Sequence, residues 1–146
     1  MHLMNIIQAC MVKASLMTGV DVATINAVAS LESTYNIHAK SSTQDYGLMQ
    51  LHKKKIFDPC KNALHGALLL KDAKVRLEKR LGSAWIIGYN LGVTGAKKFS
   101  AKGAKNFMYY KRFKAHFKPL NVLDLILTTD LPQINKKHLV VPYRMF

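Results

Sequence analysis

Acidic residues are scarce in this sequence of 146 residues, which contains 8 Asp and Glu against 22 Lys and Arg. The formal net charge of +14 favours an anionic partner, and nucleic acid, anionic lipid, lipopolysaccharide and the acid-bearing bacterial cell wall all have that chemistry. No apolar run reaches the roughly 18 residues of a membrane span, so we expect no transmembrane helix. The apolar fraction of 49% is sufficient for the core of one domain.

Cysteine and histidine are too few or too scattered to predict a metal site or a bound cofactor. Cys10 and Cys60 are the only cysteines, no CxxC pair occurs, and the six histidines show no ligand spacing such as HExxH. We therefore predict no metal and no cofactor. Two reduced thiols in the core and a single disulfide both remain compatible with the two cysteines.

Apolar residues recur at steps of three and four along most of the chain, which predicts helices. A first helix covers residues 3–17 and stops before Gly19. A second helix begins after Asp21, a favourable N-cap residue, and ends near residues 33–34. Residues 36–46 are polar and predict a loop.

The second half of the chain is also expected to be mainly helical. Asp58-Pro59 predicts the start of a third helix, which stops near Gly82. Basic and aromatic residues alternate over residues 97–118 and predict one amphipathic helix, whereas residues 122–127 fit either a helix or a strand. The predicted fold class is all-α, with at most a minor β element.

Only two glutamates occur, and their surroundings differ. Glu78 lies among Lys and Arg on the outer face of a helix, so we expect a structural role. Glu32 lies at the C-terminal end of an apolar helix, where apolar neighbours and the negative end of the helix dipole both raise the pKa of a carboxyl. Cleavage of a glycosidic bond needs such a protonated acid, because the leaving oxygen must receive a proton.

Three short motifs, in order, carry a resemblance to a known family. Glu32-Ser33, Gly47-Leu48-Met49-Gln50 and Gly88-Tyr89-Asn90 resemble the ES, GLMQ and AYN signatures of soluble lytic transglycosylases, over about residues 10–92. The resemblance is greatest to the small transglycosylases of secretion and conjugation systems, which also carry an acidic residue and an aliphatic or aromatic one before GLMQ, as Asp45-Tyr46 do here. A phage-borne enzyme is the alternative setting.

This resemblance implies a lysozyme-like domain that cleaves the β-1,4 bond between N-acetylmuramic acid (MurNAc) and N-acetylglucosamine (GlcNAc) in peptidoglycan. In the family, a glutamic acid protonates this bond and then acts as base on the muramic 6-hydroxyl, which closes a 1,6-anhydro ring. Because the nucleophile is intramolecular, no second carboxylate is needed to activate water. Glu32 is the implied catalytic residue.

The resemblance also implies which residues bind the substrate. Ser41 is expected near the N-acetyl group or the 6-hydroxyl, Met49 and Gln50 at the floor of the muramic subsite, and the Tyr89 hydroxyl near Glu32. One departure from the family pattern is the glycine of GYN, where the signature has alanine. The full implied set is Ser33, Ser41, Tyr46, Gly47, Leu48, Met49, Gln50, Tyr89 and Asn90.

The same small relatives carry a DPC element, here Asp58-Pro59-Cys60, and a second cysteine before the catalytic helix, where Cys10 stands. The resemblance therefore implies a disulfide between Cys10 and Cys60. Since a disulfide needs an oxidising compartment, we expect the periplasm or bacterial cell envelope, reached by export or by phage delivery.

Positive charge is concentrated toward the C-terminus, where residues 93–146 hold 11 basic and 2 acidic residues. We predict a lysozyme-like transglycosylase core over residues 1–95 and a basic C-terminal segment, residues 96–146, packed on the same domain. The aromatic residues of this segment are assigned to the core. Its lysines are assigned to a surface for anionic envelope lipids or lipopolysaccharide.

Two other functions remain open. A muramidase of the lysozyme type, including a phage endolysin, would hydrolyse the same bond, and Asp45 could position its water. A non-catalytic basic protein that binds nucleic acid or the envelope would explain the lysines and aromatic residues of 97–118. We do not expect a nucleic-acid partner, because no nucleic-acid-binding motif is present and Glu32 would be left without a role.

Overall fold

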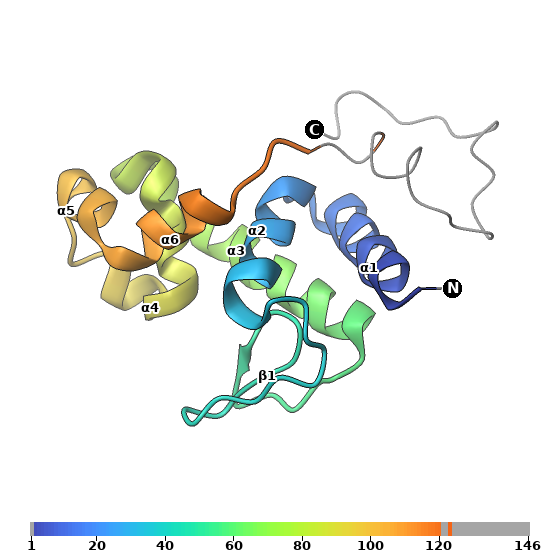
Figure 1. Cartoon of the computed structure of the whole chain (residues 1–146). Coiled ribbons are helices and arrows are strands. Elements are labelled where there is room, and N and C mark those ends of the chain that lie inside the picture. Colours follow the sequence, from blue (N-terminus) through green and yellow to red (C-terminus); the bar gives the residue numbers. More distant parts are fainter. Residues whose placement is uncertain (1, 121–122, 124–146) are drawn as a thin grey trace.

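The computed structural model of the protein describes residues 2–120 and 123, and helices build most of this part (Figure 1). The predicted all-α fold with a minor β element is confirmed. Within the described part, no helix is long and apolar enough to cross a membrane. The elements in chain order are α1 (Leu3–Thr18), α2 (Val22–Ser33), β1 (Asp45–Tyr46), β2 (Leu51–His52), α3 (Pro59–Leu81), the 3₁₀ helix η1 (Gly82–Ile86), α4 (Ile87–Ala96), α5 (Ala101–Asn106) and α6 (Met108–His116).

Local capping sets the bounds of the first two helices, as the sequence predicts. Gly19 ends α1 in the left-handed conformation, with φ 78°. The Asp21 side chain accepts a hydrogen bond from the backbone N–H of Ala23 and so caps the start of α2. Thr34, also left-handed, ends α2 directly after the residues of the first motif.

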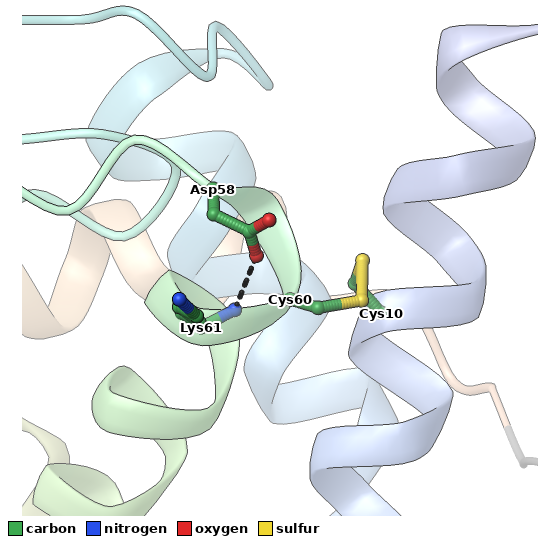
Figure 2. The surroundings of a disulfide bond; sticks show 4 residues. All are labelled: Cys10, Asp58, Cys60 and Lys61. Carbon is green, nitrogen blue, oxygen red and sulfur yellow. Dashed lines mark hydrogen bonds between the residues drawn. A yellow bond between two sulfur atoms is a disulfide. The ribbon is translucent and has the colours of Figure 1, made fainter.

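A disulfide joins the middle of α1 to the first turn of α3 (Figure 2). Cys10 and Cys60 are bonded, with their Cα atoms 4.5 Å apart, so the predicted pairing is confirmed. Beside it, Asp58 caps α3 by accepting a hydrogen bond of 2.9 Å from the backbone N–H of Lys61. The cap and the disulfide together fix the start of α3, the longest helix, against α1.

The predicted loop between α2 and α3 contains a small hairpin that the polar composition did not indicate. Asp45 pairs with His52 and Tyr46 with Leu51 in an antiparallel arrangement. Asn62 of α3 is fully buried beneath it and bonds the backbone at three points: it accepts from the N–H of Met49 and donates to two carbonyls, those of residues 46 and 56. Because a buried amide must be fully bonded, Asn62 determines the path of this segment.

The prediction of one continuous helix over residues 97–118 is wrong. Ser100 caps α5, and Phe107 has an extended backbone (ψ 136°) that separates α5 from α6. The ring of Phe107 packs edge-on against Phe99, at 5.3 Å between centroids, so the break places an aromatic side chain against the core. Of the segment 122–127, all but Leu123 lies outside the described residues.

The C-terminal helices pack on the rest of the domain through aromatic side chains. α6 lies against α2, and α5 lies against η1. Tyr109, Tyr110 and Phe113 are buried, as the assignment of aromatic residues to the core predicts, whereas Phe117 is 38% exposed. The packing of α6 on α2 brings residues near position 110 next to the end of α2, where Glu32 stands.

Candidate active site

A cavity of about 640 Å³ lies between the hairpin, the end of α2, the middle of α3 and the helix α4. Four of the predicted site residues line it: Glu32, Gln50, Tyr89 and Asn90. Asp45, the predicted water-positioning residue, also lines it. The other lining residues are Thr43, Leu51, His52, Leu69, Asp72, Ala73, Gly88, Leu91, Gly92 and Val93.

Glu32 is the penultimate residue of α2, and its side chain reaches the cavity from the helix end. Burial raises the pKa of its carboxyl above the ordinary value. A hydrogen bond from Tyr109 lowers that pKa, and the charge of Asp45 raises it again. Because burial prevails, Glu32 keeps its proton to a higher pH than an exposed glutamic acid does.

Tyr109 of α6 is the site residue that sequence reasoning missed. Its hydroxyl donates a hydrogen bond of 2.8 Å to Oε2 of Glu32, across 77 positions of the chain. Burial first, and then the charge of Glu32, raise the pKa of Tyr109 well above its ordinary value, so the hydroxyl remains a donor. No sequence spacing links the two residues, and only the packing of α6 on α2 brings them together.

Tyr89 lines the cavity, and its hydroxyl bonds the turn of the second motif. It donates to the backbone carbonyl of Met49, at 2.5 Å, and not to the carboxyl of Glu32. Burial raises the pKa of Tyr89 well above its ordinary value, and the charges of Glu32 and Asp45 raise it further, so both acids lie near it. Tyr89 thus joins α4 to the turn that carries the second motif.

The glycine of the third motif, where the family signature has alanine, has a packing reason. A Cβ at Gly88 would lie 2.4 Å from Cδ1 of Leu77 and 3.2 Å from Cβ of Ala73. Leu77 is fully buried, so it cannot move aside without disturbing the core. Gly88 therefore lets α4 approach α3 closely and keeps Tyr89 and Asn90 at the cavity wall.

The turn at residues 47–50 supports the cavity more than it lines it. Gly47 has φ 79°, and a Cβ there would lie 2.3 Å from the buried Asn62 amide, so only glycine fits. Leu48 and Met49 are fully buried, which corrects the expectation that the Met49 side chain lies at the floor. Gln50 does line the cavity, and its amide donates to the carbonyl of Gly47, at 3.1 Å.

The remaining predicted binding residues hold the loop in place and lie outside the cavity lining. Ser33 donates to the carbonyl of Leu48, at 2.7 Å, and so fixes the 47–50 turn to the end of α2. Ser41 donates to Oδ2 of Asp45, at 2.8 Å. The Tyr46 ring packs edge-on against Phe57.

The sequence profile of the transglycosylase SLT domain matches residues 9–112, more than two thirds of the chain. The protein belongs to this family. No curated protein and no solved structure matches the chain. Members of the family are lytic transglycosylases that act on peptidoglycan, so the cavity belongs to an enzyme with that class of substrate. The matched range includes both Glu32 and Tyr109.

In this transglycosylase domain, Asp45 differs from Glu32 in its surroundings. Burial raises the pKa of Asp45, but hydrogen bonds from Thr43, Ser41 and His52 oppose it, and the net effect lowers the pKa below its ordinary value. Thr43 and Ser41 donate to Oδ2, and His52 bonds Oδ1 at 2.9 Å. Asp45 is therefore held as an ionised carboxylate.

Asp72 is the third acid of the transglycosylase cavity. Its carboxylate is about half exposed and accepts from Nε of Arg76, at 3.0 Å, one turn further along α3. Among the described residues, no group of three His, Cys, Asp or Glu is placed to hold a metal ion. Burial raises the pKa of Glu32 whereas hydrogen bonds lower that of Asp45, so Glu32 is better suited than Asp45 to donate a proton.

Proposed function

We propose that this protein cleaves the MurNAc–GlcNAc β-1,4 bond with Glu32 as its single acid and base and leaves 1,6-anhydroMurNAc ends. The observation that carries the proposal is the position of Glu32, a carboxyl that lines the cavity and whose pKa burial raises. Membership of the transglycosylase family supplies the substrate class.

The reaction begins with proton transfer from Glu32 to the glycosidic oxygen. The bond between that oxygen and the muramic C1 breaks, the GlcNAc side leaves as an alcohol, and Glu32 becomes a carboxylate. The carboxylate then takes the proton of the muramic 6-hydroxyl while this oxygen bonds to C1 and closes the anhydro ring. Glu32 ends protonated, so no water is consumed and no second carboxylate is required.

Tyr109 stabilises the ionised form that Glu32 adopts between these two steps. A buried carboxylate without a hydrogen-bond donor would be costly, and the Tyr109 hydroxyl provides one at 2.8 Å. Burial and this bond act on the pKa of Glu32 in opposite directions. Their balance keeps the carboxyl able both to lose and to regain its proton.

Hydrolysis is the competing reaction, and the bonding of Asp45 argues against it. A water-activating base needs a free lone pair and an affinity for protons. Two hydroxyls bond Oδ2 of Asp45 and His52 bonds Oδ1, so three of the roughly four lone-pair sites of the carboxylate are occupied. The lowered pKa also makes the carboxylate a weak base. These contacts favour a role in shaping the hairpin.

Mass spectrometry of digested peptidoglycan tests the proposed chemistry. Wild-type protein should release muropeptides with anhydro-muramic ends, each one water lighter than the hydrolysed equivalents. Glu32→Gln should lower the rate about 10²–10⁴-fold or more, because the same residue serves as acid and base. A digest that contains only reducing muramic ends would replace the proposal with a muramidase.

The setting that fits this reaction is the periplasm or the bacterial cell envelope, in a secretion, conjugation or phage system. The Cys10–Cys60 disulfide supports an oxidising compartment. We expect exposed basic residues of α6 to bind anionic envelope material, and Lys111→Gln with Arg112→Gln should weaken binding to anionic vesicles and flatten its salt dependence. If the double variant binds anionic vesicles as well as wild type does, residues other than Lys111 and Arg112 bind the envelope.

A further inference from the structure

The cavity is lined by acids although the protein as a whole is strongly basic. Among the residues that the structure describes, Glu32, Asp45 and Asp72 line it and no Lys or Arg does. The His52 imidazole, which also lines it, is bonded to Asp45. An anionic group inside the cavity would meet the like charges of Asp45 and Asp72, with less screening than in bulk water. The cavity therefore suits the uncharged sugar rings of a glycan strand and disfavours carboxylates.

Four exposed lysines stand on the segment that builds one wall of this cavity. We name Lys40, Lys53, Lys54 and Lys55 the lysine rim. Lys53 directly follows the cavity-lining His52, and its backbone N–H donates to the carbonyl of residue 44, at 2.7 Å, which extends the hairpin by one residue pair. Lys40 is joined to the hairpin by a backbone bridge to residue 46. The backbone of the lysine rim is thus fixed beside the cavity.

Aromatic rings hold two of these lysines in place. The ammonium of Lys40 lies 5.7 Å from the ring centroid of Phe57, and that of Lys55 lies 5.7 Å from the ring centroid of Tyr46. The two rings pack edge-on at 6.0 Å. Such contacts restrict long side chains before a ligand arrives and reduce the entropy lost on binding.

Within residues 2–120 and 123, the ion pairs involve His52, Lys74 and Arg76, so no member of the lysine rim is paired with an acid. Carboxylates therefore line the cavity, and the segment that builds one of its walls carries ammonium groups without an acidic partner among the described residues. A ligand that fits both is a neutral chain with acidic branches.

We propose that the lysine rim binds the carboxylates of stem peptides on muramic residues next to the one in the cavity, which makes peptide-bearing glycan the preferred substrate. This inference rests on the proposed cleavage of peptidoglycan. Stem peptides branch from the lactyl group of muramic acid and carry free carboxylates, whereas the sugar rings are uncharged. The rim attracts the branches, and the acid-lined cavity receives the rings.

The test compares two strand preparations of equal glycan length. One carries intact stem peptides, and the other has had them removed by an amidase. The rim variant replaces all four rim lysines with glutamine. The matched control replaces four exposed lysines around α5, which removes the same charge: Lys97, Lys98, Lys102 and Lys105. In Figure 1, α5 lies apart from the hairpin segment, and none of the control lysines lines the cavity.

For the rim variant, we expect kcat/KM on peptide-bearing strands to fall about tenfold at low salt, the size expected for the loss of a few exposed ion pairs. On naked strands, kcat/KM of the same variant should change less than about twofold. The control variant should change less than about twofold on both strands. The wild-type preference for peptide-bearing strands should decrease as salt rises. Amidation of the carboxylates on the stem peptides should abolish this preference.

An equal loss on both strands, an equal loss in the control variant, or a wild type without preference would overturn the inference. Binding of fluorescent strands to Glu32→Gln protein, with and without the rim substitutions, separates it from the chemistry. If the wild type cleaves neither strand, the proposed function fails, and this binding measurement alone decides whether the lysine rim recognises stem peptides.

Discussion

Removal of the Tyr109 hydroxyl is the sharpest test of how the site works. Tyr109→Phe keeps the buried ring and deletes the donor that lies 2.8 Å from Oε2 of Glu32. A hydrogen bond to a charged group contributes about 1.5–3 kcal/mol, and one pKa unit corresponds to about 1.4 kcal/mol. The pKa of Glu32, already raised by burial, should therefore rise further in the variant.

The consequence appears in the pH profile and in kcat. Cleavage needs protonated Glu32, so the alkaline limb of kcat/KM should move to higher pH in Tyr109→Phe. The carboxylate formed after proton donation loses its stabilisation, so kcat at neutral pH should fall about 10–100-fold. Both quantities can be measured with soluble glycan strands and product chromatography.

The neighbouring tyrosine provides a matched control. Tyr110 is buried in the same helix, but its hydroxyl bonds the hydroxyl of Ser83, at 2.8 Å, outside the cavity. Tyr110→Phe should leave the pH profile unchanged, with a stability loss of about 1 kcal/mol. A reduced kcat in Tyr109→Phe with an unmoved alkaline limb would refute the reasoning, because the hydroxyl would then not act through the pKa of Glu32.

Three further predictions concern the acids and the disulfide. Glu32→Gln should melt at a higher temperature than wild type at pH 7–8, because a carboxyl whose folded pKa is raised progressively destabilises the fold as the pH rises above its unfolded pKa. The difference should vanish below about pH 4, where glutamic acid is largely protonated in both states. Asp45→Asn should keep substantial cleavage and release the same anhydro products, whereas collapse of activity would favour a water-activating role. Cys10→Ala with Cys60→Ala opens a loop with a sequence separation of 50. By the chain-entropy model, this change should lower the free energy of unfolding by ~4 kcal/mol in denaturant titrations, and a loss below ~1 kcal/mol would contradict that model.

Features that depend on a few neighbouring residues can be predicted from the sequence. Asp21 and Asp58 cap helices because their carboxylates reach N–H groups two or three positions later, a distance that any tertiary fold preserves. The same local rules placed Glu32 at the end of α2, directly before the loop. The disulfide and several residues that line the cavity could be predicted from the family motifs, because the order of these motifs along the chain indicates the family.

Only the tertiary structure decided which partner each site residue meets. The Tyr109–Glu32 bond spans 77 positions and the Tyr89–Met49 bond spans 40, so helix packing, not local pattern, selects them. A motif does not distinguish a side chain that lines a cavity from one that supports it, and Met49 proved to be fully buried. The pKa of a carboxyl likewise depends on burial and on the hydrogen-bond donors around it. For this reason the pKa of Glu32 is raised and that of Asp45, in the same cavity, is lowered.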